Sequence, residues 1–182
     1  VALSYSSQAA SRGGVAAGWS LDLPMIRVDY SGGLVQGARF VAQLGPSSGR
    51  LVDTTGTGDR LLTSGASARG YRLELDDQFT RFEHLGPGLG WVAFTTEGVK
   101  HEFGVDAASN YRDVRWYLRR QTDRFGNMVE NTWVKHSNLG GEAVDYYISR
   151  IDYGRNDRAS LGHHAAVVFE YDPQPTTCGG SE

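Results

Sequence analysis

The chain has 182 residues and a formal net charge of −3, with 40% hydrophobic residues, 21% charged residues and 24 glycines. This composition is typical of a globular chain with many turns and excludes a disordered one. The small net charge and scattered arginines lack the basic footprint of a nucleic-acid-binding protein. Because no apolar run approaches the roughly 20 residues that cross a bilayer, we also expect no membrane span.

The length fits one β-rich domain, which we assign to residues 1–171, followed by a flexible tail over residues 172–182. Cys178 is the sole cysteine, so an internal disulfide and a metal site built on several thiolates are both excluded. The first residues lack the basic and apolar regions of a signal peptide. Arg119 and Arg120 form the only adjacent basic pair, and we interpret them as a solvated strand end.

Alternating apolar residues indicate strands along most of the chain, because side chains of a strand point in turn to opposite faces. One extended segment ends near Pro24. The residues predicted to share a strand face are, in chain order, Trp19, Leu21 and Leu23; Tyr71, Leu73 and Leu75; Val99, His101 and Phe103; Trp116 and Leu118; Val129, Asn131 and Trp133; Tyr147, Ser149, Ile151 and Tyr153; and Val167, Phe169 and Tyr171.

Glycine-containing turns predict how these strands pair. Glu97 and Gly98 separate two apolar segments, and we predict a tight two-residue hairpin loop there. Residues 123–127, from Asp123 to Gly126 and Asn127, separate the Trp116 strand from the next one. We predict a second hairpin with left-handed backbone at Gly126 and Asn127, where that geometry costs least.

The remaining stretches are rich in small residues. Residues 45–49, 53–59 and 64–70 are interpreted as mobile loops that project from a sheet or lie at its edge. No window shows a sustained helical period, so at most a short helical turn is expected at residues 106–110. The predicted fold class is all-β, built from antiparallel hairpins as a twisted sheet, a sandwich or part of a β-shell.

Residue types that could carry chemistry are isolated in the sequence. Asp76 and Asp77 are adjacent and would point to opposite faces of a strand, so we interpret them as a turn. His163 and His164 lack further ligands at metal-binding spacing, and we interpret them as exposed loop residues. His101 lies on an apolar face with Val99 and Phe103 and is interpreted as a hydrogen-bonded core histidine.

Residues 56–58 (Gly-Thr-Gly) resemble a phosphate-binding loop only superficially, because no lysine follows and no strand-to-helix pattern surrounds them. No cofactor or metal is therefore expected. The four tryptophans, Trp19, Trp91, Trp116 and Trp133, could form a sugar-binding platform, but their place in alternating strands favours burial in the core.

Five fragments, taken together and in order, resemble the N-terminal domain of the Salmonella virulence plasmid protein B (SpvB) family, which also begins the B component of insecticidal toxin complexes. They are residues 18–24, 79–82, 91–104, 116–118 with 122–127, and 147–154, and the similarity spans most of residues 1–171. The last fragments resemble the segments leading into tyrosine-aspartate (Rhs) repeats. The residues that carry the motif are Gly18, Trp19, Pro24, Trp91, Gly98, Trp116, Asp123, Gly126 and Asn127.

The resemblance implies a secreted or cell-surface bacterial protein, in which this region is a part of a hollow β-shell that encloses or presents a toxic C-terminal segment. It implies further strands or subunits of the same assembly as partners. The Glu-x-Glu pair of the ADP-ribosyltransferase found in some family members is absent from the sequence, so we expect a structural module and not an enzyme. The alternative is a carbohydrate-binding or adhesin β-sandwich module.

Overall fold

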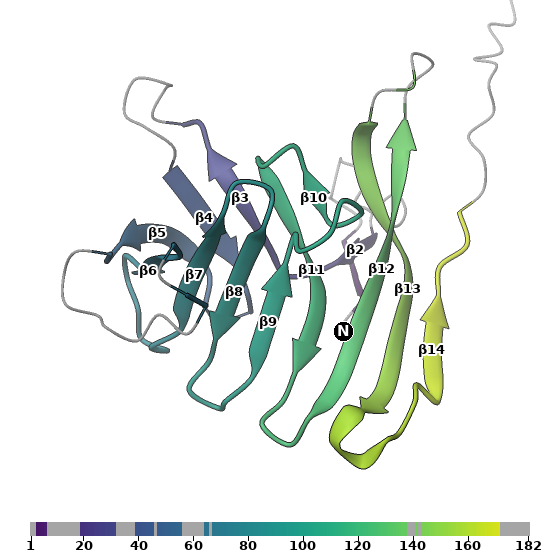
Figure 1. The fold of residues 1–182 in the computed structure, drawn as a ribbon. Coiled ribbons are helices and arrows are strands. Elements are labelled where there is room, and N and C mark those ends of the chain that lie inside the picture. Colours follow the sequence, from purple (N-terminus) through teal and green to yellow (C-terminus); the bar gives the residue numbers. More distant parts are fainter. Residues whose placement is uncertain are drawn as a thin grey trace, which may run out of the picture.

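The computed structural model describes residues 3–6, 19–31, 39–45, 47–55, 64–65, 67–137, 141 and 143–171 (Figure 1). These residues form antiparallel strands, and the one helical element among them is a 3₁₀ turn at Asp157–Ala159. The strands are β1 (Leu3–Tyr5), β2 (Trp19–Leu21), β3 (Met25–Asp29), β4 (Arg39–Gln43), β5 (Gly49–Asp53), β6 (Arg69–Leu73), β7 (Arg81–Gly86), β8 (Gly90–Phe94), β9 (Lys100–Phe103), β10 (Asn110–Tyr111), β11 (Arg115–Thr122), β12 (Asn127–Ser137), β13 (Ala143–Asn156) and β14 (Ala165–Val168). The predicted all-β antiparallel class is confirmed.

Eight strands close into a barrel in the order β3-β4-β5-β6-β7-β8-β9-β11. Strand β11 closes the ring because it pairs with both ends of the series. Its residue Leu118 lies opposite Phe103 of β9, and the Leu118 amide also donates to the carbonyl of Pro24 at the start of β3. Closure satisfies the backbone groups along both edges of the sheet, which an open sheet leaves unpaired.

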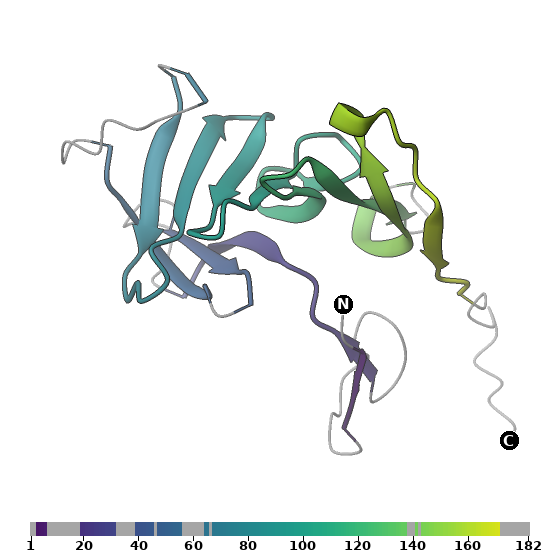
Figure 2. The ribbon, with the colours of Figure 1, turned by 90° about the horizontal axis from the view of Figure 1, so that it is seen from below.

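The sheet also continues outside the barrel. Beyond Leu118, the edge of β11 that pairs with β3 pairs instead with β12, where Arg120 lies opposite Glu130. Strands β12, β13 and β14 then form a strip that extends away from the barrel (Figure 1). Strands β1 and β2 form a separate two-stranded sheet, which lies apart from the barrel in Figure 2.

The barrel interior is aromatic at one end and polar at the other. Trp91 and Trp116 are fully buried with ring centroids 5.7 Å apart, and Phe40, Tyr71 and His84 pack around them. Toward the other end the residues are smaller: Ala93 lies on β8, Thr95 directly follows β8 and Thr80 directly precedes β7. Large rings therefore fill one end, while the opposite end keeps a cavity.

A second core lies on the outer face of the shared strand. Tyr117, between the barrel residues Trp116 and Leu118, points the opposite way because strand side chains alternate. It packs with Trp133 and Tyr146, at ring-centroid distances of 4.5 and 5.5 Å. The cluster also contains Leu23, Ile148 and Ile151, with Leu21, Tyr111, Val129, Tyr153 and Phe169 against it. The segment from the end of β2 to the start of β3 thus packs against the strip.

Both predicted hairpins are present. The loop at Glu97-Gly98 is one residue longer than expected. The Thr95 amide donates to the Val99 carbonyl and the Gly98 amide to the Thr95 carbonyl, which leaves a three-residue loop. Gly98 has φ +79° and Gly126 has φ +91°, so each supplies the left-handed residue of its loop. The prediction was wrong for Asn127, which begins β12.

The side chains of Asp123 and Asn127 still define the second loop. The Asp123 Oδ1 atom accepts hydrogen bonds from the amides of Phe125 and Asn127, at 2.8 and 2.9 Å. The Asn127 side-chain amide donates to Asp123 Oδ2 at 2.8 Å. These contacts hold the loop closed at its base, as aspartate and asparagine commonly do in turns.

Two predicted strand faces are wrong. Leu75 is 89% exposed because β6 ends at Leu73. In β13, the buried residues are Tyr146, Ile148 and Ile151, with Tyr153 beside them, instead of the predicted series containing Tyr147 and Ser149. Thr132 pairs with Arg150 and Trp133 with Ile148, so Ser149 is an extra residue that shifts the alternation by one.

Two local interpretations also need correction. Of the stretches 45–49, 53–59 and 64–70, interpreted as mobile loops, the first and second include the end residues of β5 and the third includes the start of β6. Residues 106–110 form a hydrogen-bonded turn, in line with the expectation of at most a short helical turn there, and a 3₁₀ turn lies at Asp157–Ala159. Arg119 and Arg120 lie within β11 in ion pairs and are not a solvated strand end.

Candidate functional site

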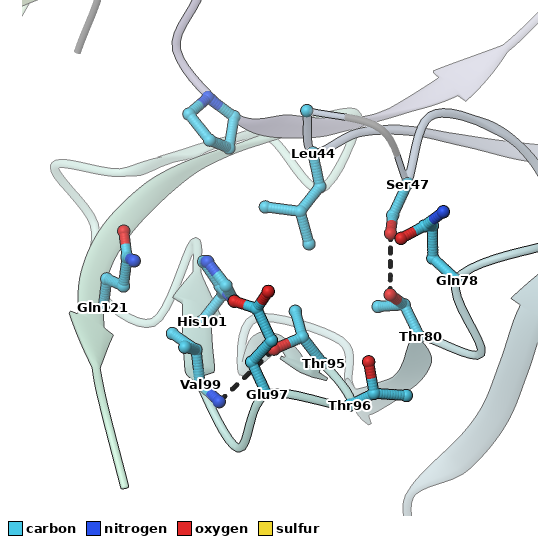
Figure 3. A pocket seen from close by; sticks show the side chains of 12 residues that line it. Leu44, Ser47, Gln78, Thr80, Thr95, Thr96, Glu97, Val99, His101 and Gln121 are labelled. Carbon is cyan, nitrogen blue, oxygen red and sulfur yellow. Dashed lines mark hydrogen bonds between the residues drawn. The ribbon is translucent and has the colours of Figure 1, made fainter. Parts of the chain in front are cut away.

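A cavity of about 310 Å³ opens at the polar end of the barrel (Figure 3). Its walls come from the strand ends and loops that meet there, including the β4–β5 loop, the segment before β7 and the β8–β9 hairpin. The lining residues are Pro24, Leu44, Gly45, Ser47, Gln78, Thr80, Thr95, Thr96, Glu97, Val99, His101 and Gln121. The mouths of β-barrels are common positions for small-ligand sites.

Uncharged polar groups line much of this cavity. The hydroxyls of Ser47 and Thr80 are buried and hydrogen-bonded to each other at 2.7 Å. The Thr95 hydroxyl accepts from the Val99 amide at 3.3 Å, so its proton remains available to a further acceptor. Leu44 and Val99 supply apolar surface beside these groups (Figure 3).

His101 is the most unusual group in the cavity. Its side chain projects inward from β9, the residue is only 6% exposed, and its Nδ1 atom has no hydrogen-bond partner among the described residues. Burial lowers the pKa of His101 from 6.5 to about 4, because the charged imidazolium loses its hydration. The imidazole is therefore neutral at physiological pH.

Charged residues gather on the outer face of the barrel, where they form ion pairs. Glu102 accepts from Arg120 Nε at 2.6 Å and from Lys100 Nζ at 3.0 Å. Burial alone would raise the pKa of Glu102, but these two cations together hold it below its usual value. Arg119 donates to Asp106 at 2.8 Å. These contacts join β9, β11 and the turn between β9 and β10.

Strand β14 forms the second candidate site because one of its edges has no neighbouring strand among the described residues. It pairs with β13 through Val167 opposite Ile151, and the Phe169 amide donates to the Ser149 carbonyl. In an antiparallel pair, the residues between these positions direct their backbone groups to the other edge. Within the part of the chain that the structure describes, Ala166 and Val168 therefore have unpaired backbone groups, and Val167 and Val168 are both exposed.

The sequence-predicted motif residues lie in different parts of the fold. Trp91 and Trp116 fill the aromatic end of the barrel and Pro24 lines the cavity, whereas Gly98 and the residues 123–127 form hairpin loops. Trp19 belongs to β2 and pairs with Tyr5. Gly18 lies outside the described residues. The motif thus marks structural positions and does not converge on one site.

Burial of tryptophan is confirmed for Trp91, Trp116 and Trp133, so these three do not form an exposed sugar platform. His101 is buried in the core, as predicted, and it also lines the cavity, but the expected hydrogen bond is missing at Nδ1 among the described residues. Sequence reasoning missed Ser47, Thr80 and Gln121, because small polar residues at strand ends carry no distinctive pattern.

The other candidates remain apart. Asp76 and Asp77 lie in the connection between β6 and β7, as predicted, and His163 and His164 are exposed. His163 contacts Glu130 at 2.7 Å, and within the described part of the chain no group of metal-ligating residues gathers. Residues 56–58 and Cys178 lie outside the described residues. No described helix is long and apolar enough to cross a membrane.

This geometry defines a closed eight-stranded antiparallel barrel continued by an open strip. Solved structures share it. The N-terminal domain of effector protein SpvB from Salmonella typhimurium strain LT2 matches with a TM-score of 0.65 and 22% identity over 84% of this chain and 57% of that one. The TcdB2-TccC3-Cdc42 complex matches with a TM-score of 0.63 and 18% identity, over 83% of this chain and 8% of that one.

The Photorhabdus luminescens Tc holotoxin pore also matches, with a TM-score of 0.60 and 20% identity over 84% of this chain and 8% of that one. At these identities the comparisons show a shared fold. The resemblance of the sequence to the SpvB and toxin-complex domains is thus confirmed at the level of structure. The chain spans less than two thirds of each of these proteins. No family model and no curated protein matches the sequence.

Proposed function

We propose that this chain is a non-catalytic structural and interaction module of a secreted bacterial toxin. In this role the barrel is a rigid anchor, and the strip is the part that continues into a β-shell enclosing or presenting a toxic C-terminal segment. The observation that carries the proposal is the passage of one strand, β11, from the closed barrel into the open strip. The shared fold with SpvB and with toxin-complex components supports it.

The shared strand couples the two parts mechanically. Trp116 and Leu118 belong to the barrel core, while Tyr117 between them belongs to the strip core. The strip therefore cannot rotate against the barrel without disturbing one of the two cores. Such a rigid connection suits a module that fixes the direction in which further strands are added.

The free edge of β14 supplies the place for that addition. Exposed sheet edges pair readily with other strands unless charge, proline or a covering segment prevents it. Strand β14 reads Ala165-Ala-Val-Val168, with neither charge nor proline. An added strand would pair with the backbone of Ala166 and Val168 and cover the exposed Val167 and Val168 side chains.

A domain exchange tests this role. Residues 1–171 would replace the matching domain of TcdB2, and complex formation with TccC3 would be measured by size-exclusion chromatography and electron microscopy. We expect the chimera to form a stoichiometric complex. Ala166→Pro should abolish complex formation, because proline removes the outward N–H without removing a bond to β13. Ala166→Ser keeps that N–H and is the matched control.

The isolated domain carrying Ala166→Pro should retain its circular dichroism spectrum and thermal stability. A folded chimera that never assembles would contradict the structural role, and so would equal assembly by the proline and serine variants. A turnover that a single cavity substitution removes, without unfolding the domain, would contradict the non-catalytic part of the proposal.

A further inference from the structure

We propose that the polar mouth of the barrel binds a small, neutral, polyhydroxylated molecule of monosaccharide size. The inference stands on the cavity and does not depend on the scaffold role, which uses the strip edge on another part of the fold. It also differs from the sugar platform considered from the sequence, because the tryptophans of that platform are buried elsewhere.

The cavity results from unequal filling of the barrel. An eight-stranded barrel has an interior that side chains can just fill or that can hold one small ligand. Here the rings of Trp91, Trp116 and Phe40 fill one end. At the other end the lining residues are smaller, among them Thr80 and Thr95, and about 310 Å³ stays unfilled. This volume is near the lower limit of about 300 Å³ for ligand pockets, so only a small molecule fits.

The polar groups require hydrogen-bond partners that a neutral ligand can supply. His101 is more than nine-tenths buried and lines the cavity, and its Nδ1 atom has no hydrogen-bond partner among the described residues. A buried polar group without a partner costs about 1–3 kcal/mol. Thr95 has a hydroxyl proton to donate, and the Gln121 amide offers both a donor and an acceptor. Hydroxyl groups, which donate and accept, match this mixture.

Charge argues against ionised ligands. Among the described residues that line the cavity there is no lysine or arginine, and Glu97 is the one acidic residue. An anion would be desolvated without a compensating cation, which is costly in a buried site. Glu97 lies at the exposed hairpin tip, where water screens its charge, so it is weak compensation for a desolvated cation.

The rim has one strained residue. Phe79 has φ +54° and is 71% exposed, while its neighbours Gln78 and Thr80 both line the cavity. A bulky residue in the left-handed region is uncommon and costs about 1–3 kcal/mol. The backbone at this point therefore directs Gln78 and Thr80 inward and leaves an aromatic ring outside, beside the opening.

The test uses three pyranoses that differ in charge: glucose, glucuronate and glucosamine, with galactose and myo-inositol as further neutral probes. Binding to the full chain, labelled with ¹⁵N, would be followed from amide chemical shifts. We expect at least one neutral probe to shift the amides of Thr95, Val99, His101 and Gln121. We expect each charged analogue to bind at least about tenfold more weakly than the best neutral probe.

Val99→Phe fills the cavity, while Val134→Phe adds the same ring to an exposed position of β12 and is the control. The first should abolish the shifts and the second should leave them unchanged, with both variants keeping the β-sheet spectrum. The proposal is overturned if no neutral probe shifts these amides at tens of millimolar, if a charged analogue binds as tightly, or if Val99→Phe binds normally.

Discussion

The barrel and the strip are built from the same kind of strand, yet they satisfy their backbones differently. In the barrel, β11 pairs with β9 and β3, so the ring of strands has no free edge along this seam. In the strip, β14 has a free outer edge among the described residues. The barrel buries Trp91 and Ile26 completely, whereas the side chains of β14 are all exposed.

The comparison suggests that the two parts contribute stability and adaptability separately. Closure fixes the register of the barrel strands, because a slip at one pairing would disturb all the others. The strip is more irregular: the pairing of β12 with β13 has register shifts at Met128/Val129, Thr132/Trp133 and His136/Ser137, whereas the barrel pairings of β7 with β8 and of β9 with β11 have one shift each. Bulges of this kind bend and twist a ribbon. A curved ribbon attached to a rigid barrel suits the wall of a shell.

The largest effect should come from the shared strand. Trp116→Ala removes a ring that is 1% exposed and contacts Trp91, Phe40 and His84. We expect it to lower the free energy of unfolding by about 3–5 kcal/mol, the usual cost of such a truncation in a core. Because β11 belongs to both regions, chemical denaturation should show barrel and strip losing stability together.

Ile151→Ala is the matched truncation in the strip, since Ile151 is also fully buried but belongs only to the second core. Hydrogen exchange should accelerate in β12, β13 and β14 while the barrel amides stay protected. If Ile151→Ala accelerated exchange equally in both regions, the strip and the barrel would open as one unit, and the distinction between them would fail.

Local turn chemistry was enough to predict the hairpins at Gly98 and Gly126, because the residues that determine each loop are adjacent in sequence. It could not predict barrel closure. The pairings of Tyr117 with Met25 and of Leu118 with Phe103 join separate segments of the chain. The alternation of residues within a strand does not determine which other strand it pairs with. The fold class was therefore accessible, while the topology was not.

The errors have the same physical origin. Counting every second residue fails at Ser149, where one inserted residue exchanges the two faces of β13. Strand β5 has a single buried residue, Leu51, so its sequence shows no alternation of apolar and polar residues that would predict a strand. The cavity depends on Ser47 from the β4–β5 loop, Thr80 from the segment before β7 and Gln121 from β11, which meet only after the ring closes. His101 was identified as buried, but its place at an opening was not predictable.

A smaller effect should appear with acidification. The pKa of His101 is about 4 in the folded protein and 6.5 in the unfolded reference, so the unfolded chain binds the proton more readily. The contribution of His101 is fully present above pH 6.5 and is lost as the pH falls. Between about pH 6.5 and 5 the loss should approach about 2 kcal/mol, since one pKa unit corresponds to about 1.4 kcal/mol.

His101→Leu removes this titration and is compared with the parent chain by urea denaturation at each pH. The burial of His84 also lowers its pKa, but that residue is present in both proteins and its effect cancels. Carboxylates with lowered pKa values, such as Glu102, lose their contribution only at lower pH. Parallel stability curves for the two proteins from pH 6.5 to 5 would contradict the assignment.

The smallest effect tests the loop that joins the barrel strand to the strip. Gly126 has φ +91°, and a Cβ atom there would meet Arg158 Cδ at 3.1 Å and Asn156 Oδ1 at 3.2 Å. Gly126→Val should therefore lower the free energy of unfolding by about 1 kcal/mol, the lower end of the usual cost, because a β-branched residue is strained in this region but the atoms it would meet belong to flexible side chains. Gly162→Val is the control, since Gly162 lies outside the left-handed region and its Cβ would meet no atom within 4 Å. Thermal unfolding should separate the two variants; if they melt together, the loop does not need left-handed backbone to hold β11 against β12.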